Sequence, residues 1–130
     1  MRREIKFRAW DKIKKLIIPV VAPMPLGGVL VPAGESKVGI MGAYQKNYNY
    51  LSSERVELMQ FTGLLDKNGK EIYEGDKGFD INDDFYEVKF DEGKFIAVMN
   101  GDVIVDLSEV AEDVEVIGNI YENSELNKHN

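Results

Sequence analysis

Carboxylates are the residues of this chain best suited to acid–base chemistry, and several of them are neighbours in the sequence. The adjacent pairs are Asp83/Asp84, Asp91/Glu92 and Glu112/Asp113. Acid–base catalysis by two carboxylates requires that they have different environments and face one cleft. Neighbours on a turn point apart and stay hydrated, so we expect no catalytic residues and no enzymatic activity.

Two acidic stretches approach the spacing of a calcium-binding EF-hand loop. Position 6 of such a loop must be glycine, because the chain bends sharply there. The stretch that starts at Asp80 has Phe85 at this position, and the stretch that starts at Asp66 has Glu71. Neither stretch fits the loop, and we expect no metal site.

The sequence lacks the residues needed for thiol chemistry, for catalysis by histidine and for a phosphate-binding loop. The chain has no cysteine and one histidine, His129, which excludes disulfides and argues against a Ser-His-Asp relay. Gly27-Gly28 lacks the Gly-x-x-x-x-Gly-Lys-Ser/Thr spacing of a phosphate loop. We therefore expect no cofactor, and the absence of cysteine suits a reducing cytoplasm.

The charges are divided unevenly along the chain, whose formal net charge is −7. Residues 1–50 hold nine Lys/Arg and three Asp/Glu, a net charge of +6, whereas residues 51–130 hold seven and twenty, a net charge of −13. One interpretation is simply a lopsided hydrated surface. Another is that the basic part docks on the acidic part, in the same chain or in a neighbour.

A basic run near the N-terminus is the candidate contact for nucleic acid, with a tryptophan available for base stacking. The candidate residues are Arg2, Arg3, Lys6, Arg8 and Trp10, and the run continues to Lys12, Lys14 and Lys15. The negative charge of the whole chain argues against this role, so nucleic acid is not the favoured partner.

A tight turn and a glycine corner dominate the middle of the chain. Gly69 supplies the positive φ that the first turn needs, and Asn68 tolerates it. Asp76 follows Gly75 at a sharp corner, where aspartate often accepts hydrogen bonds from the backbone. We interpret Asp66, Asn68, Gly69, Gly75 and Asp76 as structural turn residues.

Alternation of apolar and polar residues predicts short strands along most of the chain. The first two form a hairpin, and three near the C-terminus form an antiparallel meander with tight turns at Glu92-Gly93 and Asn100-Gly101. The expected strands are 4–10, 14–21, 38–41, 54–61, one starting near 77, 85–91, 95–99, 103–105 and 114–121. Residues 107–113 fit a helical turn with Ser108 as its cap, and Asn123-Ser124 fits the cap of another.

Residues 22–37 are expected to form an apolar loop rich in proline and glycine. The surrounding stretch 16–34 is uncharged, but its prolines would break a membrane-spanning helix repeatedly. Two placements of the loop stay open, either over its own core or on a neighbouring subunit. Beyond it, Tyr44, Tyr48 and Tyr50 with Lys46 make a polar-aromatic patch, suited to packing more than to base stacking.

These elements indicate a mainly β protein with minor α structure. The expected architecture is a small SH3-like antiparallel barrel in the C-terminal half plus an N-terminal β-hairpin and arm. We expect a single domain over 1–130, with the hairpin and Pro/Gly-rich arm in 1–52 and the barrel-like core in 53–124.

Three long motifs stand out: REIKFRAWD at 3–11, LMQFTGL followed by DKNGKEIYEGD within 58–76, and VIGNIYEN at 116–123. Together they resemble the YopX family of small proteins from prophages and phages of Gram-positive bacteria. The resemblance covers essentially the whole chain. It implies an oligomeric phage or prophage protein in the bacterial cytoplasm, and it implies no activity and no catalytic residues.

Two functions from different classes follow. The leading one is an accessory protein that acts by binding a phage or host protein and by homo-oligomerisation, without catalysis. The alternative is a nucleic-acid-associated small-barrel module that uses the basic N-terminal run.

Overall fold

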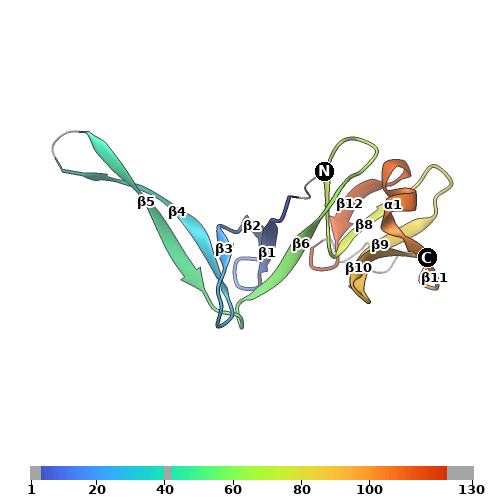
Figure 1. Ribbon diagram of the computed structural model, residues 1–130, viewed down its shortest axis with the longest axis horizontal. Helices are drawn as coiled ribbons and strands as arrows, with labels where there is room; N and C mark the ends of the chain where they lie inside the picture. Colours follow the sequence, from blue (N-terminus) through green and yellow to red (C-terminus); the bar gives the residue numbers. More distant parts are fainter. Residues whose placement is uncertain (1–3, 40–41, 123–130) are drawn as a thin grey trace. The chain divides into compact units, whose positions relative to one another are not determined.

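The computed structural model describes residues 4–39 and 42–122, and it is mainly β with little helix, which confirms the expected class (Figure 1). The chain falls into two compact units. The N-terminal unit is Lys6–Leu58, and the C-terminal unit is Met59–Asn130 together with Met1–Ile5. Each unit has its own buried apolar cluster. The single domain expected over 1–130, with parts 1–52 and 53–124, stays a prediction.

The first two strands form the expected hairpin. β1 (Phe7–Asp11) pairs antiparallel with β2 (Leu16–Pro19). The carboxylate of Asp11 holds the turn, because its Oδ1 accepts hydrogen bonds from the backbone N–H groups of Ile13 at 3.0 Å and Lys14 at 3.2 Å. This is the local geometry in which aspartate favours a turn over a continuing strand.

The segment 22–37 is not the loop that its prolines and glycines predicted. It contains β3 (Ala22–Pro23) and most of β4 (Val29–Val38). Together with β5 (Ala43–Leu51), they make a three-stranded sheet in the order β3-β4-β5. The strand expected at 38–41 is the end of β4, and residues 40–41 lie outside the described residues.

Proline is tolerated in β4 because of where it lies. β3 pairs only with Val29 and Leu30, so Pro32 lies beyond the end of β3. The register with β5 shifts between Pro32 and Glu35, and strand edges and bulges are the places in a sheet that accept proline. Gly34, with φ +86°, lies inside this bulge.

The core of the N-terminal unit is formed at the base of this sheet. Its buried members come from β1, from the first part of β4, from the end of β5 and from the start of the next strand. They are Ala9, Val29, Val31, Leu51 and Val56, with Ile18 and Val20 packed against them. Beyond Val31, the rest of β4 contributes nothing to this core.

β6 (Val56–Leu65) begins in the N-terminal unit and continues into the C-terminal unit. It confirms the strand expected at 54–61 and extends it. Within the C-terminal unit it pairs with β7 (Glu71–Tyr73), where Phe61 lies opposite Tyr73 with ring centroids 5.5 Å apart. The Asp66–Gly69 turn connects these two strands.

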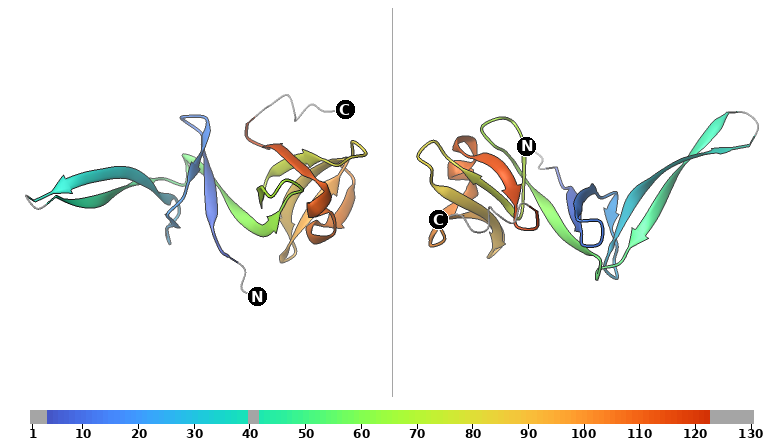
Figure 2. Two further views of the ribbon diagram at one scale, coloured as in Figure 1. Left: turned by 90° about the horizontal axis from the view of Figure 1, so that it is seen from above. Right: turned by 180° about the vertical axis from the view of Figure 1, so that it is seen from behind.

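A curled five-stranded sheet forms most of the C-terminal unit (Figures 1 and 2). Its order is β11-β10-β9-β8-β12. The strands are β8 (Asp76–Phe79), β9 (Phe85–Asp91), β10 (Lys94–Met99), β11 (Val103–Asp106) and β12 (Glu115–Asn119). The expected meander is confirmed, and positive φ at Asn100 and Gly101 gives the expected tight turn.

The α-helical turn α1 (Leu107–Val110) and the 3₁₀ turn η1 (Ala111–Asp113) precede β12. They confirm the helical turn expected at 107–113, but the expected cap is wrong. The N-cap is Asp106, which makes no side-chain capping bond. Burial of Leu107 positions this short turn instead.

The core of the C-terminal unit lies between the curled sheet and these turns. Its buried members are Ile72, Tyr86, Val88, Ala97, Leu107, Ala111, Val114 and Val116. No helix within residues 4–39 and 42–122 is long and apolar enough to cross a membrane. The SH3-like form of the barrel stays a prediction, and Asn123-Ser124 lies outside the described residues.

Candidate interaction surface

The outer part of the β4–β5 hairpin is a two-stranded ribbon, which we define as Pro32–Val38 with Ala43–Tyr50. Figure 2 shows its two strands twisted around each other from two directions. Nearly all of its described side chains are exposed, Asn47 being half-buried. A two-stranded hairpin is at best marginally stable in water without a third strand or a packed face. The ribbon is therefore the segment of the N-terminal unit that most needs a partner.

One side of the ribbon carries a row of tyrosines. Tyr44, Tyr48 and Tyr50 alternate along β5, so their side chains lie on one face, and they are 67%, 48% and 55% exposed. Residues directly opposite in an antiparallel pair share a face. The cross-strand partners in β4 are Lys37 opposite Tyr44, Glu35 opposite Lys46, Pro32 opposite Tyr48 and Leu30 opposite Tyr50. We call these eight residues the tyrosine face.

The middle of the other side of the ribbon is polar. Asn47 donates a hydrogen bond to the hydroxyl of Ser36 at 2.6 Å, and Gln45 donates one to Asn47 at 3.3 Å. At its outer end Val38 lies opposite Ala43. The tyrosine face therefore differs from this side in carrying the aromatic rings of the ribbon.

Two features give the tyrosine face a defined shape. The hydroxyl of Tyr50 donates a hydrogen bond to the carbonyl of Gly27 at 3.1 Å, which fixes this ring at the base of the hairpin. Further out, Tyr48 and Pro32 line a hollow of about 440 Å³ together with Val21 and Lys46. A partner's side chains can pack into this hollow and against the aromatic ring beside it.

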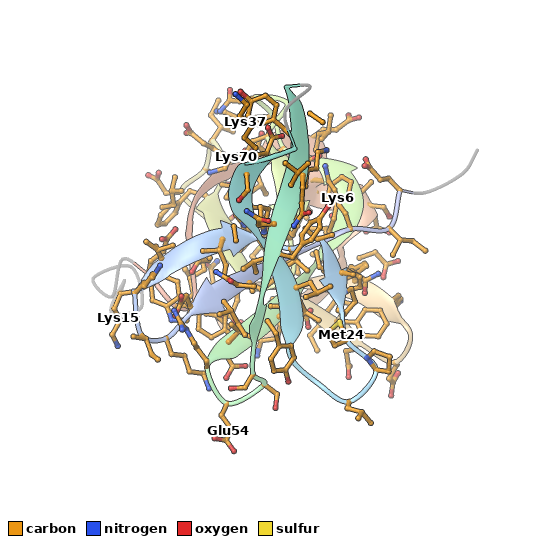
Figure 3. The ribbon with its side chains drawn as sticks, turned by 90° about the vertical axis from the view of Figure 1, so that its left-hand side faces the viewer. Lys6, Lys15, Met24, Lys37, Glu54 and Lys70 are labelled. Carbon is orange, nitrogen blue, oxygen red and sulfur yellow. The ribbon has the colours of Figure 1, made fainter. Side chains whose placement is uncertain are left out.

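The basic N-terminal run is only partly on the surface. Lys6 and Arg8 are half-buried, and Trp10 is 8% exposed, so its ring is not accessible for stacking on a base. Arg2 and Arg3 lie outside the described residues. The exposed lysines of the run lie instead on the β1–β2 turn, where Figure 3 shows Lys15.

An ion pair that the sequence did not predict lies beside this turn. Asp11 is 1% exposed, and its carboxylate accepts hydrogen bonds from Arg55 Nε at 3.1 Å and Nη2 at 2.9 Å. These bonds, opposed by burial, lower the pKa of Asp11 from 3.8 to about 2, and the backbone N–H groups of Lys14 and Ile13 also lower it. Nearby, Lys12 pairs with Glu57 at 2.9 Å, which neutralises part of the basic run.

Acid is expected to destabilise the N-terminal unit through Asp11. Its lowered pKa means that the folded state binds this proton less readily than the unfolded state. The contribution of Asp11 to the free energy of unfolding is therefore full above pH 4 and is lost as the pH falls towards 2. Urea unfolding between pH 2 and pH 6 measures it, because the one tryptophan, Trp10, is buried in this unit and reports its unfolding by fluorescence.

The variant Asp11→Asn is expected to be less stable at pH 6 and to have a flatter stability curve below pH 4. The exposed Asp91→Asn variant is the control and should follow the unchanged protein. Parallel pH curves for the unchanged protein and Asp11→Asn would show that the ion pair does not carry the effect.

The turn residues of the central motif are tied to their surroundings by backbone hydrogen bonds. Asp66 Oδ1 accepts bonds from the N–H groups of Asn68 at 2.8 Å and Lys70 at 2.9 Å, and Oδ2 accepts one from Val116 at 2.9 Å. Burial raises the pKa of Asp66, but these three bonds outweigh it and the pKa is lowered. Gly69 has φ +80° in the same turn.

Two further carboxylates of the acidic motifs, those of Asp76 and Asp80, also accept hydrogen bonds from nearby groups. Gly75 has φ +89°, and Asp76 Oδ2 accepts a hydrogen bond from the backbone of Tyr73 at 2.7 Å. Asp80, the start of the first EF-hand-like stretch, accepts bonds from the N–H of Asp84 at 3.0 Å and the hydroxyl of Tyr86 at 2.8 Å. Within residues 4–39 and 42–122, no group of three His, Cys, Asp or Glu side chains could hold a metal.

Comparisons with known proteins agree with the motifs of the sequence. The family model described as YopX protein matches residues 6–128. Among solved structures, the crystal structure of protein EF1440 from Enterococcus faecalis is similar, with 28% sequence identity, a TM-score of 0.68, and coverage of 96% of this chain and 99% of that chain. No curated protein matches.

Proposed function

The chain belongs to the YopX family, and we propose that it is a non-enzymatic accessory protein of a phage or prophage that assembles with itself through the tyrosine face. In this role it acts by binding a phage or host protein in the bacterial cytoplasm. The observation that carries the proposal is the row of exposed tyrosines on a two-stranded ribbon. Tyrosine is enriched in protein interfaces because it buries a large apolar ring while its hydroxyl keeps a polar partner.

A second copy suits this face because the face carries its own complementary charges. Glu35 lies opposite Lys46, and Lys37 lies two residues from Glu35 on the same strand. A two-fold axis through such a surface brings each patch against the identical patch of the partner. Glu35 of one copy can then meet a lysine of the other while the tyrosines bury one another.

The carboxylates support a role without catalysis. Asp66, Asp76 and Asp80, which stand in the most acidic motifs, accept hydrogen bonds from the backbone and fix turns. The oxygens of these carboxylates already accept structural hydrogen bonds, whereas a general acid or base must be within hydrogen-bond reach of the substrate.

The basic run gives less support to the nucleic-acid alternative. The ring of Trp10 is buried, and Lys12 is paired with Glu57. The C-terminal unit, with eight Lys/Arg and nineteen Asp/Glu, has a net charge of −11 and would repel a polyanion.

Light scattering tests the proposed assembly. The unchanged protein should give a defined oligomer at micromolar concentration. The double variant Tyr44→Ser/Tyr48→Ser should raise the dissociation constant of this oligomer by at least about tenfold, because it removes two central aromatic rings. Both side chains are exposed in the single chain, so the double variant should still fold. The fluorescence of Trp10 shows whether its N-terminal unit is folded.

The matched control is Ile81→Ser, which removes an 89% exposed apolar side chain from the C-terminal unit and should leave the mass unchanged. A monomeric unchanged protein at every salt concentration, or an oligomer that the double variant leaves intact, would refute assembly through the tyrosine face.

A further inference from the structure

The two edges of the five-stranded sheet in the C-terminal unit differ. At β12, the turn after β6 covers the edge, because the N–H of Lys67 donates to the carbonyl of Val114 at 3.0 Å and the N–H of Val116 donates to Asp66 at 2.9 Å. At the other edge, β11 has β10 as its strand neighbour among residues 4–39 and 42–122. Alternate residues of an edge strand direct their N–H and C=O groups away from the sheet.

The first three side chains of β11 leave this edge open. The strand reads Val-Ile-Val-Asp, with Val103 45% exposed and Ile104 65% exposed. Proteins protect an exposed edge with proline, charged side chains, a bulge or a very short strand, and β11 has only its short length and the terminal Asp106. β11 contains no proline and no lysine, and its pairing with β10 runs in regular register from Val103 to Asp106. Its β-branched residues are those that form a strand most readily.

The surroundings of this edge are acidic. Asp102 precedes the strand, Asp106 ends it, and Glu109 follows in α1. Lys94 is paired with Asp106 at 2.7 Å, and its pKa is raised first by this hydrogen bond and then by the charges of Asp106, Glu109 and Glu92. The nearby lysine is thus already neutralised, and the field at β11 is negative.

The negative charge around β11 favours one of the two partners that could pair with this strand, a second copy of the chain or a basic segment of another protein. A second copy placed edge to edge would bring two acidic strands together, which is unfavourable. An extended segment with alternating basic and apolar residues would complete the backbone hydrogen bonds, bury Ile104 and place its positive charges near Asp102 and Glu109.

We propose that β11 binds an extended, Lys/Arg-containing segment of a partner protein, which adds a strand to the five-stranded sheet. The main-chain hydrogen bonds of the added strand supply affinity, and the acidic border selects for a basic sequence. The site lies in the C-terminal unit and uses no residue of the tyrosine face, so each proposal can fail without the other.

Amide NMR of the full chain tests this site with two synthetic probes, the blocked octapeptides (Lys-Val)4 and (Glu-Val)4. The basic peptide should shift the amide signals of Val103–Asp106 and slow their hydrogen exchange. It should bind at least about tenfold more tightly than the acidic peptide and lose affinity as salt is raised.

Ile104→Lys should weaken binding of the basic peptide by about tenfold, because it places a positive charge on the edge. Ile81→Lys makes the same change at an exposed position outside the sheet, and it should bind the peptide as the unchanged protein does. Equal affinities for the two peptides, or shifts spread away from β11, would overturn the proposal. So would an oligomer of the unchanged protein that Ile104→Lys dissociates, since the occupant would then be a second copy.

Discussion

Gly78→Ala should lower the free energy of unfolding of the C-terminal unit by about 3 kcal/mol or more. Gly78 lies in β8, opposite Val116 of β12. A Cβ at this position would lie 2.2 Å from the carbonyl oxygen of Glu115 and 2.8 Å from Cγ1 of Val114. Because the first of these atoms belongs to the backbone, β12 must move away from β8. The movement would open the core that Val114 and Val116 help to fill.

Thermal unfolding followed by circular dichroism measures this effect, and a loss of 3 kcal/mol corresponds to a fall of about 10 °C or more for a domain of this size. Gly93→Ala is the control. Gly93 adopts a conformation that favours glycine, with φ +82°, but a Cβ added there would have no other atom within 4 Å. It should cost only about 1 kcal/mol. Equal losses for the two variants would show that the close approach of β8 and β12 is unimportant.

Asp66→Ala should destabilise the same unit by about 2–4 kcal/mol, because it leaves three backbone N–H groups without their acceptor. The most costly is the N–H of Val116, which is buried, whereas those of Asn68 and Lys70 lie closer to solvent. Urea unfolding monitored by circular dichroism measures the change.

Asp66→Asn separates the two roles of this side chain. Its remaining oxygen can still accept bonds within the turn, but its amide cannot accept the N–H of Val116, so its loss should be intermediate. The exposed Asp91→Ala variant should stay within about 0.5 kcal/mol of the unchanged protein. If Asp66→Ala were as stable as Asp91→Ala, the link between the turn and β12 would contribute nothing to folding.

The parts of the fold that sequence predicts are those with local causes. The turns at 66–69 and 100–101 follow from residues that tolerate positive φ, and the meander from 85 to 105 follows from alternation around such turns. Asp76 also belongs to this group, because the N–H that it accepts is only three residues away.

The ribbon was missed because it lacks the alternation that reveals strands. Both sides of its outer part are exposed, so β5 reads as a polar-aromatic stretch, and Pro32 and Gly34 in β4 resemble a loop. Proline and glycine interrupt a strand in a sheet interior, but they fit a bulge on a ribbon. Only the pairing of the two strands distinguishes these cases.

Contacts that join distant residues could not be predicted from the sequence. Trp10 was a candidate for base stacking, yet its ring is buried. Arg55 and Asp11 are 44 residues apart in sequence, and Asp66 and Val116 are 50 apart. No spacing rule connects such pairs, because only the folded chain brings them together.

The two separate cores have a consequence for synthesis of the protein. Every residue of the N-terminal core lies between Ala9 and Val56, and the buried apolar residues of the C-terminal unit begin at Met59. The first core is thus complete in sequence before translation reaches the second. A nascent chain ending at Leu58 has ten Lys/Arg and five Asp/Glu, a net charge of +5, whereas the finished chain has −7. A polyanionic surface such as that of the ribosome should therefore attract the early chain and repel the finished one, and the sign of this interaction should reverse during translation.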